Sequence, residues 1–137
     1  MPAHHIQGRA VVGSARGKLA PLRDRLGVLG AEITSFWWPR AYDRNHGGFH
    51  GSLDREGRPC APSDKTLVQQ ARHLWALSMY LERRPGGSSQ QQLIDMAHGT
   101  REFLTHFADP RDGRFFWEVD RAGSLRDPAK ILYGQGF

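Results

Sequence analysis

Residues 43–49 read Asp-Arg-Asn-His-Gly-Gly-Phe, and residues 109–115 repeat this stretch in outline as Asp-Pro-Arg-Asp-Gly-Arg-Phe. A second pair of segments follows at the same interval of 66 residues, Asp-Arg-Glu-Gly at 54–57 and Asp-Arg-Ala-Gly at 120–123. After each loop comes a lysine, and then a helix-like start that contains a glutamine. An internal repeat of this length indicates helical-hairpin units that stack and bury one another's apolar faces.

The segments around the repeated loops predict helices. Apolar residues recur every three or four positions over residues 19–37, 65–84 and 90–107. Pro39 restricts Trp38 and is expected to end the first helix. Ser63 or Asp64 is expected to cap the second helix, and Ser89 the third.

The remaining segments predict loops. The glycine turns within residues 42–60 predict a β-hairpin or an extended loop. Residues 1–16 are polar and contain glycine, and we expect them to form a flexible N-terminal arm. We expect residues 17–137 to be the N-terminal portion of a helical domain that is truncated at its C-terminal end.

Composition excludes several classes of protein. The net charge of +5 and the pI of about 10.0 permit nucleic-acid binding, but the basic residues are scattered singly among acidic neighbours, so no nucleic-acid partner is expected. No apolar stretch approaches the ~20 residues that span a bilayer, so no membrane partner is expected. The single cysteine, Cys60, and the lack of a visible secretory signal favour a cytoplasmic protein.

Four segments together resemble the N-acylglucosamine 2-epimerase family. Residues 35–49 run Ser-Phe-Trp-Trp-Pro-Arg-Ala-Tyr-Asp-Arg-Asn-His-Gly-Gly-Phe, and residues 53–58 follow as Leu-Asp-Arg-Glu-Gly-Arg. Residues 65–75, with Lys65 and Gln-Ala-Arg at 70–72, are similar to a helix of the family. Residues 116–137 look closest to its cellobiose 2-epimerase branch. The resemblance covers roughly residues 20–137.

The resemblance implies an all-α fold, the N-terminal part of an (α/α)6 toroid of the six-hairpin type, with β-hairpin-like loops at one end. It implies a small carbohydrate substrate and no cofactor. It also implies that two histidines move the proton at C2 through an enediol intermediate. Those histidines belong to the later part of the toroid, so we expect this chain to be an inactive fragment. No oligomeric state follows from the pattern.

Arg72 is the candidate catalytic residue. It lies among apolar residues of the predicted second helix, which predicts a buried side chain that must find partners. By the resemblance it matches the family's pocket arginine near O1 and O2 of the sugar, where a guanidinium stabilises enediolate charge. The structural alternative is an ion pair with a carboxylate.

Three aromatic residues are candidate substrate-binding residues. By the resemblance Tyr133 matches a tyrosine on the second inner helix, able to stack on a sugar and to donate a hydrogen bond. Phe116 and Trp117 are expected either to line the mouth of the pocket or to anchor the hairpin to the toroid.

The histidines and the repeated aspartates predict structure rather than chemistry. His46 and His50 lack a third ligand at a convincing spacing, so no metal site is expected. His73 is expected to be structural, and His98 and His106 exposed on the outer helix. Because Asp54 and Asp120 recur in both units, they are expected to form Asx turns.

Two other functions remain open from the sequence. One is a toroid that hydrolyses glycosides, which needs two carboxylates flanking the bond. The other is a non-catalytic helical module that binds carbohydrate or protein. The sugar itself could be N-acylglucosamine, mannose, glucose or cellobiose, and the reaction could be epimerisation or aldose–ketose isomerisation.

Overall fold

The computed structural model describes residues 9–83 and 90–137, which divide into two compact units, one ending at Trp37 and one running from Trp38 to Phe137. Helix α1 (Arg9–Ala41) forms the described part of the first unit, and its last turn begins the second. The helix begins earlier than expected: residues 9–16, assigned to the N-terminal arm, are helical. Residues 1–8 lie outside the described part.

The expectation that Pro39 ends the first helix is wrong. The helix continues to Ala41, because Trp38 and Ala41 are buried in the core of the second unit. The Trp38 carbonyl also accepts a hydrogen bond from the Tyr42 N–H at 3.0 Å. Packing of this last turn therefore outweighs the hydrogen bond that proline removes.

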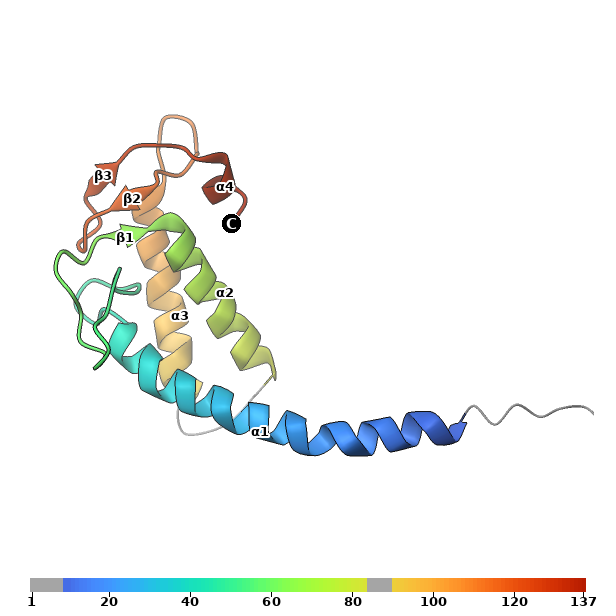
Figure 1. Ribbon diagram of the computed structural model, residues 1–137. Helices are drawn as coiled ribbons and strands as arrows, with labels where there is room; N and C mark the ends of the chain where they lie inside the picture. Colours follow the sequence, from blue (N-terminus) through green and yellow to red (C-terminus); the bar gives the residue numbers. More distant parts are fainter. Residues whose placement is uncertain (1–8, 84–89) are drawn as a thin grey trace, which may run out of the picture. The chain divides into compact units, whose positions relative to one another are not determined.

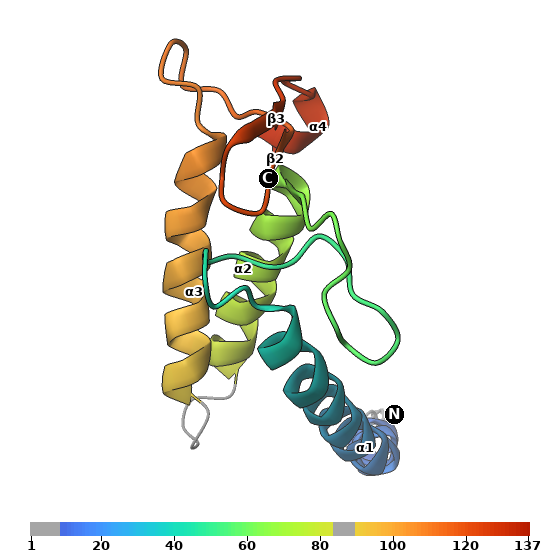
Figure 2. The same ribbon diagram turned by 90° about the vertical axis from the view of Figure 1, so that its left-hand side faces the viewer.

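The second unit is built on two antiparallel helices that lie side by side (Figures 1 and 2). These are α2 (Leu67–Arg83) and α3 (Gln90–Leu104), which the 3-10 helix η1 (Thr105–Phe107) extends. The predicted helices over 65–84 and 90–107 are thus confirmed for most of their length, while residue 84 and Ser89 lie outside the described residues. None of the described helices is both long and apolar enough to cross a membrane.

Two clusters of buried side chains form the core of the second unit. One joins the end of α1 to the two long helices, and the other lies where α2 begins and α3 ends. The first cluster contains Trp38, Ala41, Phe49, Leu77 and Met96, and the second contains Leu67, Phe103, Phe107 and Val119.

A small antiparallel sheet covers one end of the helix pair (Figure 2). Its strands are β1 (Lys65–Thr66), β2 (Glu118–Val119) and β3 (Leu125–Asp127), in the order β1-β2-β3. Lys65 pairs with Val119 across the first ladder. The predicted second helix therefore begins two residues late, at Leu67, and Ser63 does not cap it: its hydroxyl lies 2.9 Å from Nδ1 of His50.

The repeated loops have the same backbone hydrogen bonds. Asp43 N–H donates to the Gly48 carbonyl at 2.8 Å, and Asp109 N–H donates to the Arg114 carbonyl at 2.7 Å. In the following turns, the Asp54 carboxylate accepts the N–H groups of residues 56 and 58, and the Asp120 carboxylate those of residues 122 and 124. The Asx turns predicted from the repeat are confirmed.

A buried ion cluster joins the first repeated loop, at residues 43–57, to the second, at residues 109–123. Asp43 and Lys65 are fully buried, and the Lys65 ammonium donates to the Asp43 carboxylate at 3.1 Å. Arg121, from the turn at residues 120–123, donates two hydrogen bonds to the same carboxylate, at 2.7 and 2.9 Å. Burial acts to raise the pKa of Asp43, but the bonds from Arg121 and Lys65 outweigh it and hold that pKa well below its usual range.

Two glutamines fix the helices that follow the loops. Gln70 accepts from the Phe49 N–H at 2.7 Å and donates to the Phe49 carbonyl at 2.8 Å. Gln135, in the short helix α4 (Leu132–Gln135), makes the same pair of bonds with Phe115, at 2.9 and 2.7 Å. Each helix is thereby held to the hairpin before it, and both clamps lie two residues from a predicted site residue, Arg72 or Tyr133.

Candidate functional site

A cavity of about 570 Å³ opens beside α2 in the second unit, and we call it the α2 cavity. Four of its lining residues, at positions 69, 72, 73 and 76, share one face of α2 because they are three or four residues apart. The full lining is Trp38, Thr66, Val68, Gln69, Arg72, His73, Ala76, Trp117 and Tyr133. Three of the four predicted site residues therefore meet in one place.

Arg72 and Tyr133 are in direct contact within the cavity. The Arg72 guanidinium donates to the Tyr133 hydroxyl at 2.5 Å, although 61 residues separate them. The guanidinium carbon also lies 5.0 Å from the ring centroid of Phe137, which packs edge-on against Tyr133. The expectation that Arg72 is buried is wrong: its side chain is exposed, on the open side of α2.

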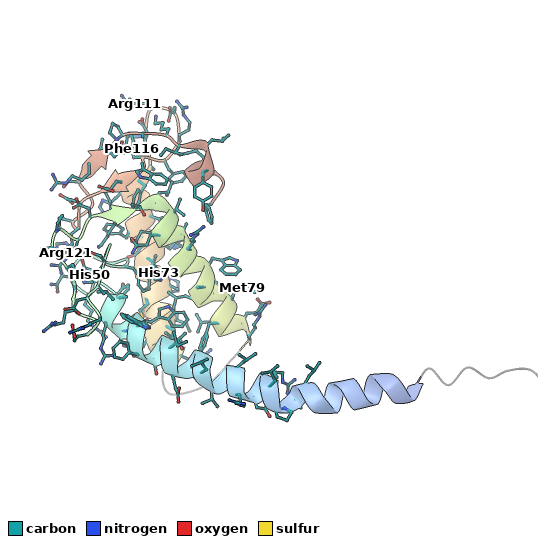
Figure 3. The ribbon with its side chains drawn as sticks, in the orientation of Figure 1. His50, His73, Met79, Arg111, Phe116 and Arg121 are labelled. Atoms are coloured by element: carbon teal, nitrogen blue, oxygen red, sulfur yellow. The ribbon has the colours of Figure 1, made fainter. Side chains whose placement is uncertain are left out.

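The two candidate aromatic residues of the second hairpin, Phe116 and Trp117, occupy different places. Trp117 lines the α2 cavity, and its carbonyl accepts the N–H of Leu67, the first residue of α2. Phe116, labelled in Figure 3, is buried and is not among the residues of the cavity lining. The Lys130 ammonium lies 5.6 Å from the centroid of its ring. The hairpin thus places Trp117 at the cavity and uses Phe116 inside the fold.

The histidines occupy different environments. His46, His98 and His106 are exposed, as expected for the last two. His50 is buried, and burial lowers its pKa. His73 lines the α2 cavity, and burial lowers its pKa to about 4. Over the described residues, no group of three or more histidine, cysteine or acidic side chains could hold a metal ion.

The cavity lining can bind a neutral, hydroxyl-rich ligand and can stabilise a negative charge. Arg72 supplies a permanent positive charge with several N–H donors in one plane. Tyr133 and Trp117 supply aromatic faces next to it. No described residue of the lining is acidic, so a charge developing on an oxygen near Arg72 meets attraction only.

The sequence pattern missed part of this lining. The sequence predicts a structural His73 and singles out neither Trp38, Thr66 nor Gln69. The helical spacing of residues 69, 72, 73 and 76 would have placed Gln69, His73 and Ala76 beside Arg72. Trp38 had no such signal, because it comes to the cavity from the end of a different helix.

Comparisons with known proteins show the family to which this chain is similar. Residues 47–137 match the family model for N-acylglucosamine 2-epimerase. A cellobiose 2-epimerase from Dictyoglomus turgidum is 32% identical over 103 residues, which are 74% of this chain and 25% of that protein. Human N-acylglucosamine 2-epimerase is 34% identical over 105 residues, or 75% of this chain and 24% of its own length. The chain thus spans about a quarter of the curated relatives that it matches.

Solved structures show the same fold. Cellobiose 2-epimerase from Spirochaeta thermophila superposes with a TM-score of 0.69 at 34% identity, over 85% of this chain and 29% of that one. A sugar epimerase from a ruminal bacterium superposes with a TM-score of 0.60 at 28% identity, over 71% of this chain and 24% of that one. The predicted fold, part of an (α/α)6 toroid with hairpin loops at one end, is confirmed.

Proposed function

Because this chain belongs to the N-acylglucosamine 2-epimerase family, we propose that the α2 cavity holds the reacting end of a sugar during proton transfer at C2. The observation that carries the proposal is the contact of Arg72 with Tyr133, which turns a permanent cation and a phenol toward one open cavity. The substrate class is an aldose with a free reducing end, of the N-acylglucosamine, mannose, glucose or cellobiose type.

In the proposed reaction, a base removes the proton from C2 of the open-chain aldose. The electron pair forms the C1–C2 double bond, and negative charge develops on O1 of the enediolate. The Arg72 guanidinium donates to this oxygen and to O2, and Tyr133 holds the guanidinium in place. Return of a proton to the opposite face of C2 gives the epimer. Transfer of the O2 proton to O1, with delivery of a proton to C1, forms the carbonyl at C2 and gives the ketose.

The proton-transferring residues are, in this proposal, histidines contributed by a later part of the toroid. Of the described residues, the cavity lining offers His73, whose pKa of about 4 is poorly matched to acid–base work near neutral pH. The proposed role of Arg72, Tyr133 and Trp117 is then substrate binding and stabilisation of charge. Trp117 supports this role because an indole face packs well against the apolar face of a sugar ring.

Substitution of Arg72 tests the proposal. In a protein that continues this chain to the length of its relatives, we expect Arg72→Ala to lower turnover by ~10²–10³, the usual cost of one preorganised donor. Arg72→Lys keeps the charge but not the planar fork, so it should rescue poorly. Turnover is measured as exchange of the C2 proton with deuterated water, for mannose, cellobiose and N-acetylglucosamine.

Melting curves of the same variants provide the control. Arg72 is exposed and its hydrogen bond to Tyr133 lies at the surface, so its loss should change the melting temperature little. If Arg72→Ala keeps near-normal turnover per folded molecule, Arg72 does not act at the reacting end. Measurable exchange by the 137-residue chain alone would show that the proton-transferring groups have been misplaced.

A further inference from the structure

His73 is the one histidine whose ring lines the α2 cavity among the described residues. It follows Arg72 directly and lies on the same face of α2 as Gln69 and Ala76. The mechanism above gives it no part. His73 belongs to α2, and Figure 3 labels it where the two long helices α2 and α3 lie side by side.

One face of the imidazole is fixed by stacking. The rings of His73 and Phe49 lie parallel, with centroids 4.0 Å apart and planes inclined by 10°. Phe49 is fully buried, and both of its backbone polar groups are held by Gln70. The plane of the imidazole is thus set by a part of the fold that is itself rigidly bonded, so a ligand would not have to order it.

The polar edge of the same ring is open. Within the part of the chain that the structure describes, no hydrogen bond joins the His73 ring to another residue. Among those residues no buried side-chain nitrogen or oxygen lacks a partner. The His73 nitrogens are therefore accessible, and the space that the side chain borders is the α2 cavity.

The protonation state decides what this edge can bind. Burial holds the pKa of His73 at about 4, so the ring is neutral near pH 7 and carries one N–H donor and one free lone pair. A charged ring would only donate, and it would repel the neighbouring guanidinium. A neutral ring matches a hydroxyl group, which also both donates and accepts.

We propose that His73 is a substrate-binding residue, whose imidazole exchanges hydrogen bonds with a hydroxyl of the sugar while Arg72 contacts the reacting end. This inference rests on the proposed function and adds a second residue that binds the sugar. His73 fixes the rotation of the sugar about the axis that Arg72 defines, so it selects for the position of a hydroxyl and transfers no proton itself.

The experiment follows the imidazole nitrogens of the 137-residue chain by NMR, with ¹⁵N-labelled histidine and arginine. Without sugar, His73 should titrate near pH 4. At pH 7, cellobiose, mannose and N-acetylglucosamine are added in turn. We expect the nitrogen signals of His73 and the Nε signal of Arg72 to move with one saturating dependence on sugar concentration.

Three variants separate binding from packing. His73→Phe keeps a ring against Phe49 but removes both nitrogens, and we expect it to weaken sugar affinity about tenfold, the equivalent of one neutral hydrogen bond of about 1.4 kcal/mol. His73→Gln retains a donor and an acceptor and should recover part of this loss. His98→Phe makes the same change at an exposed histidine of α3 and should leave the affinity unchanged.

The outcomes distinguish the two proposals. If sugar moves the Arg72 signal but not the His73 signals, or if His73→Phe binds as tightly as the parent chain, the role of His73 is overturned and the proposed function stands. If no sugar moves either residue, the proposed function falls and His73 falls with it. A His73 that titrates near its usual value of about 6.5 would also overturn the inference.

Discussion

Replacement of Asp43 by asparagine should destabilise this protein more than any equivalent change in the second loop. Asp43 is fully buried and neutralises the fully buried Lys65, while Arg121 donates to both of its oxygens. Asparagine keeps the size and one acceptor oxygen, but it removes the negative charge. The Lys65 ammonium would then stay buried with no anionic partner, held by the carbonyls of Gly47 and Arg121 and by the Phe103 ring, whose centroid is 4.0 Å away.

The expected loss can be bounded from this geometry. Removing one member of a buried ion pair costs about 3–5 kcal/mol, and the two carbonyl partners of Lys65 favour the lower end. A chain of this length loses about 3–4 °C of melting temperature per kcal/mol. Asp43→Asn should therefore melt ~10 °C or more below the parent, a large part of a stability that is typically 5–15 kcal/mol.

The repeat provides a matched control. Asp109 has the equivalent position, but its partners Lys130 and Arg111 are 16% and 78% exposed, so water can solvate them when the carboxylate is lost. Asp109→Asn should lower the melting temperature less.

The double variant Asp43→Asn/Lys65→Met removes the stranded charge as well. It should melt above Asp43→Asn alone, because it leaves no uncompensated ammonium in the buried site. Melting is followed by circular dichroism at pH 7. Equal losses for Asp43→Asn and Asp109→Asn, or no recovery in the double variant, would refute the reasoning.

Two further predictions concern the hairpin and the cavity. Gly48 has φ of 65°, and an added Cβ would lie 2.7 Å from Oε1 of Gln70, whereas Gly113 has φ of 70° and open space around it. Gly113→Ala should therefore lower the free energy of unfolding only by the ~1–2 kcal/mol of left-handed strain. Gly48→Ala should lower it by more, and urea unfolding of both variants measures the difference. Because the unfolded His73 ring binds its proton near pH 6.5 and the folded ring near pH 4, stability should fall by about 2 kcal/mol between pH 7 and pH 5. His73→Phe should lack this part of the decline, and an unchanged pH profile would contradict the assigned burial.

Local features of the fold followed from the sequence because their causes are local. The Asx turns at Asp54 and Asp120 depend on side chains that bond backbone groups two and four residues ahead, so a repeated Asp-x-x-Gly pattern was enough. The helices over 67–83 and 90–104 followed from apolar periodicity in the same way.

Long-range features did not follow. Pro39 remains helical because of packing around Trp38 and Ala41, which outweighs local propensity. The hydrogen bond from Arg121 to Asp43 joins residues 78 positions apart, and the sequence of neither loop predicts it. For the site, resemblance singled out Arg72 and Tyr133, but their contact and the approach of Trp38 required the fold.

The link between Asp43 and Arg121 also sets an order of events during synthesis. A ribosome that adds about 5–20 residues per second reaches Arg121 roughly 4–16 s after Asp43. During that interval the nascent first hairpin has Lys65, once made, but neither the guanidinium nor the Arg121 carbonyl that completes the ammonium's shell. The bonds around the buried Asp43–Lys65 pair can thus be completed only when the second hairpin has emerged, so the two hairpins mature together rather than in succession.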